Sequence, residues 1–459
     1  MYDELAFENC QYSRDPLLGC ALEGVASVVA GIRDASIVIH SPQGCAATVS
    51  AAFDACEVDF TRRKIGCTRL FESDVIMGAS EKLKAIIREA EESFDCKVMF
   101  VVGTCAADII GEDIEGVCFE MQPSVKARLI PVYAGGFRGD FLTGIDSALE
   151  CLIPLIKKRR NVYGNRVNII APQASLNPTW WADVHWTVGI LRELGLEINS
   201  ILTFNSSMAD IEGLSNASAN IVLSQDAGYD FAKKLEQLYA IPLILSDIPL
   251  PVGLANTSRW IRSLAHYFGV SKRADRIVAE GEKRVIDILR RRALMIIPRY
   301  HNCKVAVSAD STFGTGLVRM LFEDLEMLPE LILLRSSSRI AKEVMARELK
   351  DMGIAPKIVF DLDGYKLKQA LLTHDIDAVF GSSWEYYISK EVGIKLAFDI
   401  FSPTNRDIYL DRAFLGYDGM LTILEIVAND WERAFRSKEI IYRNNLHDAK
   451  KVTSSLQFC

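Results

Sequence analysis

Short apolar runs recur along the whole chain, and each is followed by a loop and then by a segment with helical spacing. These runs are predicted to be strands, at residues 36–39, 98–102, 129–132, 167–170, 219–223, 242–245, 304–307, 331–334, 357–360 and 378–380. They are rich in Val and Ile, which is typical of strands buried on both faces of a parallel sheet. Parallel neighbours need a crossover, usually a helix, so the pattern predicts the α/β class, with mostly parallel sheets flanked by helices.

Two stretches interrupt this series and predict domain boundaries. Residues 157–166 are basic and polar, residues 290–302 contain Pro298, and each stretch precedes a fresh strand. We therefore expect three Rossmann-like domains, at residues 1–160, 161–300 and 301–459, without a sequence repeat among them. A chain of 459 residues is long enough for three domains of this size.

Composition and charge exclude several classes of protein. The chain has 52 Lys and Arg against 60 Asp and Glu, a net charge of −8, so nucleic acid is not an expected partner. No apolar run approaches the ~20 residues of a membrane helix. Because the first twenty residues also lack a signal-peptide pattern, we expect a cytoplasmic protein without membrane contacts. No G-x-x-x-x-G-K-[ST] motif is present, so ATP hydrolysis by a P-loop on this chain is not expected.

Eleven cysteines are many for the cytoplasm, where lasting disulfides are rare. Cys20, Cys45 and Cys105 lie at loop-to-helix junctions, and the last two each follow a predicted strand. A helix N-terminus stabilises a thiolate, and ligands of α/β sheets lie beyond the carboxyl ends of the strands. Thiols in such glycine-containing loops suit an iron–sulfur cluster. Buried structural thiols are the alternative, because no C-x-x-C motif occurs.

Other polar residues near these loops have structural as well as functional interpretations. His40 could hydrogen-bond near the cysteines, act as an acid–base group, or be a structural residue. The pair Glu112 and Asp113 could do acid–base work or form a solvated first turn of a helix. Residues 180–186 contain three tryptophans, which could line a pocket, form a subunit interface or pack in the core. No residue is assigned a catalytic role.

The sequence around the three cysteines resembles the nitrogenase component 1 family. Cys45 follows Cys20 by 25 residues and Cys105 follows Cys45 by 60, a spacing similar to that of the family's P-cluster cysteines. Residues 40–45, His-Ser-Pro-Gln-Gly-Cys, are similar to the family's His-Gly-x-x-Gly-Cys turn. Further similar stretches lie at residues 72–79, 103–113, 398–401 and 415–419, and the last two look like the β-type subunit.

The resemblance implies a cofactor and several partners. It implies an iron–sulfur cluster, of the P-cluster type [8Fe-7S] or [4Fe-4S], with Cys20, Cys45 and Cys105 as metal ligands. The cluster would be shared with an α-type subunit, in a heterodimer or in a heterotetramer of two such pairs. A separate ATP-dependent iron protein would deliver electrons, and a catalytic metallocluster in the α-type partner would receive them. No cysteine occurs between Cys151 and Cys303, where the α-type ligand falls, and this favours the β-type.

Departures from the family pattern bear on the substrate. Ser41 stands where the family has glycine, and Gly136 falls near the position of a serine ligand in the molybdenum β subunit. Residues 48–53 replace a longer segment rich in Arg, His and Phe. These differences favour a nitrogenase-like reductase, and we predict a methylthio-alkane reductase, which cleaves carbon–sulfur bonds in small thioethers. The alternatives are a cofactor-assembly scaffold, a dinitrogen-reducing nitrogenase β subunit, a tetrapyrrole reductase subunit, and a structural α/β protein without iron.

Overall fold

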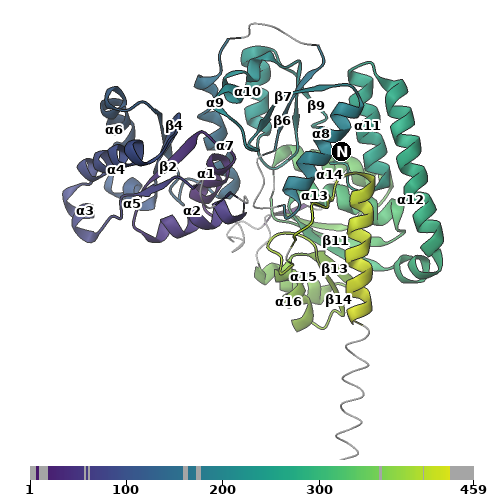
Figure 1. Ribbon diagram of the computed structural model, residues 1–459. Helices are drawn as coiled ribbons and strands as arrows, with labels where there is room; N and C mark the ends of the chain where they lie inside the picture. The colour runs from purple at the N-terminus through teal and green to yellow at the C-terminus, as the bar shows by residue number, and fades with distance from the viewer. Residues whose placement is uncertain are drawn as a thin grey trace, which may run out of the picture.

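The computed structural model describes residues 7–9, 19–55, 58–59, 63–158, 164–171, 177–336, 338–360, 364–406 and 408–434. It contains three parallel sheets, each flanked by helices, which confirms the predicted α/β class (Figure 1). Among the described helices, none combines the length and the apolarity that crossing a membrane requires.

The first sheet has the strand order β3-β2-β4-β5. Its strands are β2 (Ala35–His40), β3 (Ile65–Cys67), β4 (Val98–Gly103) and β5 (Arg128–Tyr133). Every residue of β2 and β4 is buried, because helices cover both faces. One face packs against α1 (Ala21–Ala30), α2 (Gly44–Ala55) and α7 (Phe141–Glu150), and the other against α4 (Ser80–Ser93) and α6 (Ile114–Met121). Two short helices, α3 (Glu72–Met77) and α5 (Cys105–Ile110), contact each other.

The second sheet has the strand order β7-β6-β8-β9. Its strands are β6 (Arg166–Ile170), β7 (Glu197–Leu202), β8 (Ala219–Val222) and β9 (Leu243–Ile244). The helices of this region are α8 (Trp180–Glu193), α9 (Met208–Glu212), α10 (Tyr229–Tyr239), α11 (Leu254–Tyr267) and α12 (Ser271–Tyr300). One hydrophobic core runs from this sheet into the third.

The third sheet has the strand order β1-β12-β11-β10-β13-β14. Its strands are β1 (Phe7–Asn9), β10 (Lys304–Ala309), β11 (Leu328–Leu334), β12 (Lys357–Phe360), β13 (Ala378–Gly381) and β14 (Leu396–Asp399). Its helices are α13 (Ser311–Arg319), α14 (Arg339–Met352), α15 (Gly364–Thr373) and α16 (Ser383–Glu391), followed by a helical stretch at residues 416–434. Figure 1 shows this last helix, in yellow, beside the third sheet.

Every strand predicted from the sequence coincides with a strand of the structure. The strands that were not predicted are β1, β3, β7 and β14, which are short or contain polar positions. Strand β1 pairs with β12, so residues 7–9 belong to the third sheet rather than to the first. The domain boundaries at residues 160 and 300 stay predictions.

Candidate functional site

The strand order of the first sheet brings two of the expected cysteines together. From β2 the chain crosses over to β3 on one side, whereas β4 and β5 lie on the other side, so the connections diverge between β2 and β4. Such a switch point opens a crevice at the carboxyl ends of the strands. The last residues of the two strands, His40 and Gly103, lie side by side. Cys45 in the first turn of α2 and Cys105 at the start of α5 therefore border the same crevice.

Cys20 reaches this crevice from a third element. It is the N-cap residue of α1 and pairs in an isolated bridge with Asp140, the N-cap residue of α7. Helices α1 and α7 lie in backbone contact, because a Cβ on Gly24 would be 2.0 Å from an oxygen of α7. A Cβ on Gly136 would lie 3.4 Å from Cys105 Sγ and 3.8 Å from Cys20 Cβ. Gly136 therefore lies between these two cysteines.

The three thiols are close enough to interact electrostatically. Burial raises the pKa of the Cys45 thiol, and hydrogen bonds to Ser41 and Thr104 oppose that rise. The charges of Cys20 and Cys105 raise the pKa of Cys45 further, so the three thiols disfavour simultaneous ionisation. A positively charged group in the crevice would relieve this repulsion.

The donor set fits a polynuclear cluster better than a single ion. In the described part of the chain, no group of three or more His, Cys, Asp or Glu could hold one metal ion. The thiols of Cys20, Cys45 and Cys105 nevertheless converge from separate loops, and all three are partly exposed. A cluster whose own iron and sulfide atoms span the gap between the thiols suits this arrangement, and thiolates are the usual ligands of such clusters.

A set of exposed apolar side chains lies on α5, which begins at Cys105, and on and before α3, which contacts α5. They come from α3, α5 and the residue that precedes α3, and we call them the apolar rim: Phe71, Val75, Ile76, Met77 and Ile109. Phe137, which follows Gly136, is exposed as well. Figure 1 shows α5 between α3 and α2, on the lower side of the first sheet. Exposed apolar patches of this kind mark protein–protein contact surfaces.

Of the polar candidates beside the cysteines, Glu112 and Asp113 form hydrogen bonds with the backbone, whereas His40 has no hydrogen-bond partner among the described residues. Glu112 accepts hydrogen bonds from Ala79 N and from Ser80 Oγ, and Asp113 caps α6 through Gly116 N at 2.8 Å. Their acid–base interpretation therefore has no support. His40 is fully buried, neither ring nitrogen has a hydrogen-bond partner among the described residues, and burial lowers its pKa.

The tryptophans of residues 180–186 pack in or against the hydrophobic core. Trp180 is buried and donates from Nε1 to Ala171 O at 3.0 Å, and Trp186 packs against Trp260. Burial raises the pKa of Cys118 and Cys303 to about 12. These two thiols are therefore protonated at neutral pH.

Sequence reasoning missed a second crevice, between the carboxyl ends of the second and third sheets. Asp226 follows β8 and accepts a hydrogen bond from Thr312 N at 2.9 Å, while Asp310 caps α13. Asp183 on α8 accepts from Phe414 N at 2.8 Å. A cavity of about 20 Å³ remains beside Asp183 and Asp310. The only sequence signal was a set of short polar runs directly after apolar strands.

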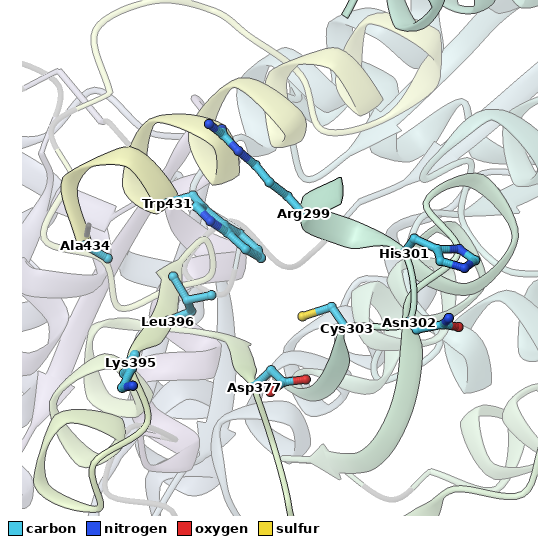
Figure 2. Close-up of a pocket in the computed structure, with 9 residues that line it drawn as sticks. All are labelled: Arg299, His301, Asn302, Cys303, Asp377, Lys395, Leu396, Trp431 and Ala434. Atoms are coloured by element: carbon cyan, nitrogen blue, oxygen red, sulfur yellow. The ribbon is translucent and has the colours of Figure 1, made fainter. Parts of the chain in front are cut away.

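A larger cavity, of about 350 Å³, lies at the opposite edge of the third sheet (Figure 2). Its lining includes Cys303, Asp377 and Lys395, which lie next to the amino ends of β10, β13 and β14. Figure 2 shows the thiol of Cys303 and the indole of Trp431 turned towards the cavity. Because ligands of parallel sheets bind at the carboxyl ends, this cavity is not part of the cysteine site.

Comparison with known proteins places the chain in a family. The family model described as nitrogenase component 1 type oxidoreductase matches residues 20–432. The match covers most of the chain, so the chain belongs to this family, as the resemblance implied. Membership confirms the oxidoreductase class and agrees with the expected iron–sulfur cofactor.

Individual relatives include nitrogenase beta chains, nitrogenase alpha chains and cofactor biosynthesis proteins. The chain is 25% identical over 447 residues to the nitrogenase vanadium-iron protein beta chain of Trichormus variabilis, covering 90% of this chain and 93% of the relative. It is also 25% identical over 419 residues to the nitrogenase iron-molybdenum cofactor biosynthesis protein NifE of Methanococcus maripaludis, covering 89% and 82%. Among solved structures, nitrogenase Cp1 at pH 6.5 has the same fold, with a TM-score of 0.76, 16% identity and coverage of 95% and 97%. Identity alone does not separate a β chain from a NifE-type protein or from an α chain, which is 24% identical over 427 residues in Methanothermobacter thermautotrophicus.

Proposed function

We propose that this chain is the β-type subunit of a nitrogenase-like reductase, with Cys20, Cys45 and Cys105 holding an iron–sulfur cluster shared with an α-type subunit. The observation that carries this proposal is the convergence of three thiols, from three separate loops, on the switch point of the first sheet. When bound, such a cluster accepts and donates electrons. The cluster is of the P-cluster type [8Fe-7S], and a [4Fe-4S] cluster is the alternative.

In the proposed complex the cluster ligands are thiolates, and two helix N-termini and one backbone N–H of this chain favour that charge, against the effect of burial on Cys45. Cys20 and Cys45 lie at the N-termini of α1 and α2, where the helix dipole stabilises negative charge. Gly136 N donates a hydrogen bond to Cys105 Sγ at 3.0 Å. Gly136 also has no side chain to fill the space between Cys105 and Cys20, which leaves room for inorganic atoms.

We propose that the apolar rim faces the α-type partner. The rim lies on α3 and on α5, the helix that begins at Cys105, and it exposes large apolar side chains, as a subunit interface does before assembly. Three thiolates from one chain are only part of the ligand set of an eight-iron cluster, so the partner supplies the remaining ligands across the interface. The assembly is a heterodimer or a doubled heterotetramer, and an ATP-dependent iron protein delivers electrons to it.

The second crevice supports an electron-transfer role over a cofactor-assembly role. A chain that carries a large metallocofactor between its second and third sheets needs an open cavity there. Here Asp226, Thr312 and Asp183 bond to their neighbours, and the cavity beside Asp183 and Asp310 is about 20 Å³. We therefore assign the catalytic metallocluster to the α-type partner.

We further propose that the substrate is a small thioether of the methylthio-alkane class. The support is the departure from the dinitrogen-reducing pattern at Ser41 and Gly136. The complex, with its iron protein and ATP, is expected to release a thiol and a hydrocarbon from such a thioether. Reduction of dinitrogen, reduction of a tetrapyrrole, or transfer of the cluster to an acceptor protein without turnover would each contradict this assignment.

The cluster itself is tested by iron and acid-labile sulfide analysis of the complex, purified without oxygen. About eight irons per αβ pair at the interface site are expected, and about four would favour the tetrapyrrole or scaffold function. Cys45→Ala is expected to lose this iron. Cys96→Ala is the matched control, because Cys96 is also partly exposed and its Sγ accepts a hydrogen bond from Ser36 Oγ at 3.2 Å, near the start of β2 and away from the crevice. Equal iron content in both variants, or no iron in the native complex, would refute the cluster assignment.

A further inference from the structure

We propose that the ion pair between Asp108 and Arg138 positions the loop at residues 134–138 so that Gly136 N–H points at Cys105 Sγ, and that this contact sets the reduction potential of the cluster. The inference rests on the cluster proposed above and adds positioning residues to it. Neither Asp108 nor Arg138 touches the thiols in its own right; both act through Gly136.

The loop runs directly beside the start of α5. Ala134 N donates to Gly103 O at 2.8 Å, which ties the loop to the last residue of β4. Arg138 N donates to Gly135 O at 2.9 Å and closes a tight turn. Inside this turn, Gly136 N donates to Cys105 Sγ at 3.0 Å, a short distance for a hydrogen bond to sulfur. The backbone of the loop therefore contacts the thiol itself.

The ion pair clamps this turn onto α5. Arg138 Nε lies 2.8 Å from Asp108 Oδ2, and Arg138 Nη2 lies 3.0 Å from Asp108 Oδ1, so the two side chains form a parallel pair of bonds. Such forks fix direction as well as distance. The guanidinium also stacks over the Tyr133 ring, 4.8 Å from its centre. A Cβ on Gly135 would lie 2.2 Å from Asp108 Oδ2, so the carboxylate packs directly against the loop backbone.

Asp108 and Cys105 lie three residues apart on the same short helix. Asp108 is largely buried, whereas Arg138 is half exposed. The pair thus connects the helix that carries the thiol to the loop that donates to it, and the two move as one unit. A half-exposed ion pair contributes little to overall stability, so breaking it should leave the fold intact. Its effect should appear in the cluster's electronic properties instead.

A hydrogen bond to a cluster sulfur favours the reduced, more negative state. Loosening the loop weakens the bond from Gly136 N and shifts the reduction equilibrium towards the oxidised form. Arg138→Lys keeps the positive charge but cannot form the two-bond fork. Because the net charge does not change, a lower potential in this variant reports the hydrogen bond rather than the field of the arginine.

The test is a redox titration, followed by electron paramagnetic resonance, of the complex purified without oxygen. Arg138→Lys is expected to keep its iron and to shift the reduction equilibrium towards the oxidised form by about tenfold, ~59 mV for a one-electron couple. Amide hydrogen exchange at residues 134–138 should become faster, in the presence and in the absence of iron. The matched control is Arg412→Lys, since Arg412 forms an exposed pair with Glu425 at 3.0 Å, and it should change neither quantity.

The outcomes separate this inference from the cluster assignment. An Arg138→Lys variant with native potential and native exchange overturns the positioning role while the cluster stands. Loss of iron without a shift in the potential of the remaining clusters overturns it too. A native complex without iron refutes the cluster, whereas faster exchange in Arg138→Lys would still establish the clamp on the loop.

Discussion

The buried ion pair between Arg335 and Glu385 allows a quantitative test of how the third sheet is held together. Arg335 Nη2 lies 2.7 and 2.8 Å from the two carboxylate oxygens, and the side chains are 6% and 2% exposed. Ser308 Oγ also donates to Glu385, at 2.9 Å. Arg335→Met removes the cation and leaves the carboxylate buried. Such a removal costs about 3–5 kcal/mol of unfolding free energy.

The loss should depend on pH in a defined direction. Burial acts to raise the pKa of Glu385, but the charge of Arg335 and the hydrogen bonds hold it below its usual value. In the native protein the carboxylate therefore adds stability above the unfolded pKa of about 4.3, and this is lost as pH falls through the lower folded pKa. In Arg335→Met only the hydrogen bonds from Ser308 and Ser382 still oppose burial, so the folded pKa is expected to rise above 4.3 and stability to recover as pH falls. The variant should be furthest below the native protein at pH 8 and closer to it at pH 5.

Urea unfolding followed by circular dichroism at the two pH values measures both effects. Arg284→Met serves as the control, because Arg284 pairs with Asp418 at the surface, where the side chains are 61% and 56% exposed. Its cost should stay within about 0.5 kcal/mol. The double change Arg335→Met with Glu385→Gln should recover most of the loss. Equal costs for Arg335→Met and Arg284→Met, or a loss that does not change with pH, would refute the reasoning.

Three further substitutions test the packing, the thiol site and a buried acid. A methyl group at Gly24 would lie 2.0 Å from a carbonyl oxygen of α7, so Gly24→Ala should lower the unfolding free energy by about 1–3 kcal/mol. Gly189→Ala is the control and should not lower it, because no atom lies within 4 Å of the added methyl group. Equal urea midpoints for the two variants would contradict this expectation. Gly136→Ala places a methyl group 3.4 Å from the sulfur of Cys105. The thermal unfolding temperature without iron should equal that of the native protein, while the affinity for metal falls about 10–100-fold. Full iron content in this variant would count against the proposed site. Burial raises the pKa of Asp324 to about 7, so the native protein loses stability as pH rises from about 4 to 7. Asp324→Asn removes the titrating group and should reduce this loss between pH 5 and 8. Parallel pH profiles of unfolding free energy for the two proteins would contradict the role of Asp324.

A strand could be predicted from the sequence where a run of apolar residues is enough to identify it. Strands β2 and β4 are buried along their whole length, so their sequences carry the burial pattern without interruption. Strand β7 contains Glu197, Asn199 and Ser200, and its pairing with β6 depends on neighbours that no local pattern reveals. Strand β3 has only three residues, one of them Gly66, and is a strand because β2 lies beside it.

The proximity of two of the cysteines could be predicted, because both follow such strands. Cys45 and Cys105 come after β2 and β4, and the strand order then places them at one crevice. The clamp around them could not be predicted. Asp108 and Arg138 are 30 residues apart, and their contact depends on the turn that follows β5. Sequence spacing shows which residues follow a strand, but not which later loop contacts those residues.

The same switch point occurs in each of the three sheets, between β2 and β4, β6 and β8, and β10 and β13. Strand order therefore creates equivalent crevices, and the side chains decide what each crevice does. In the first sheet the described loops supply thiols and an exposed apolar rim, which suits a cluster and a partner. In the other two sheets the loops face each other, and Asp226, Thr312 and Ser336 bond across the gap. The contrast is why we place the proposed cluster at the first sheet, while the second and third sheets close on each other.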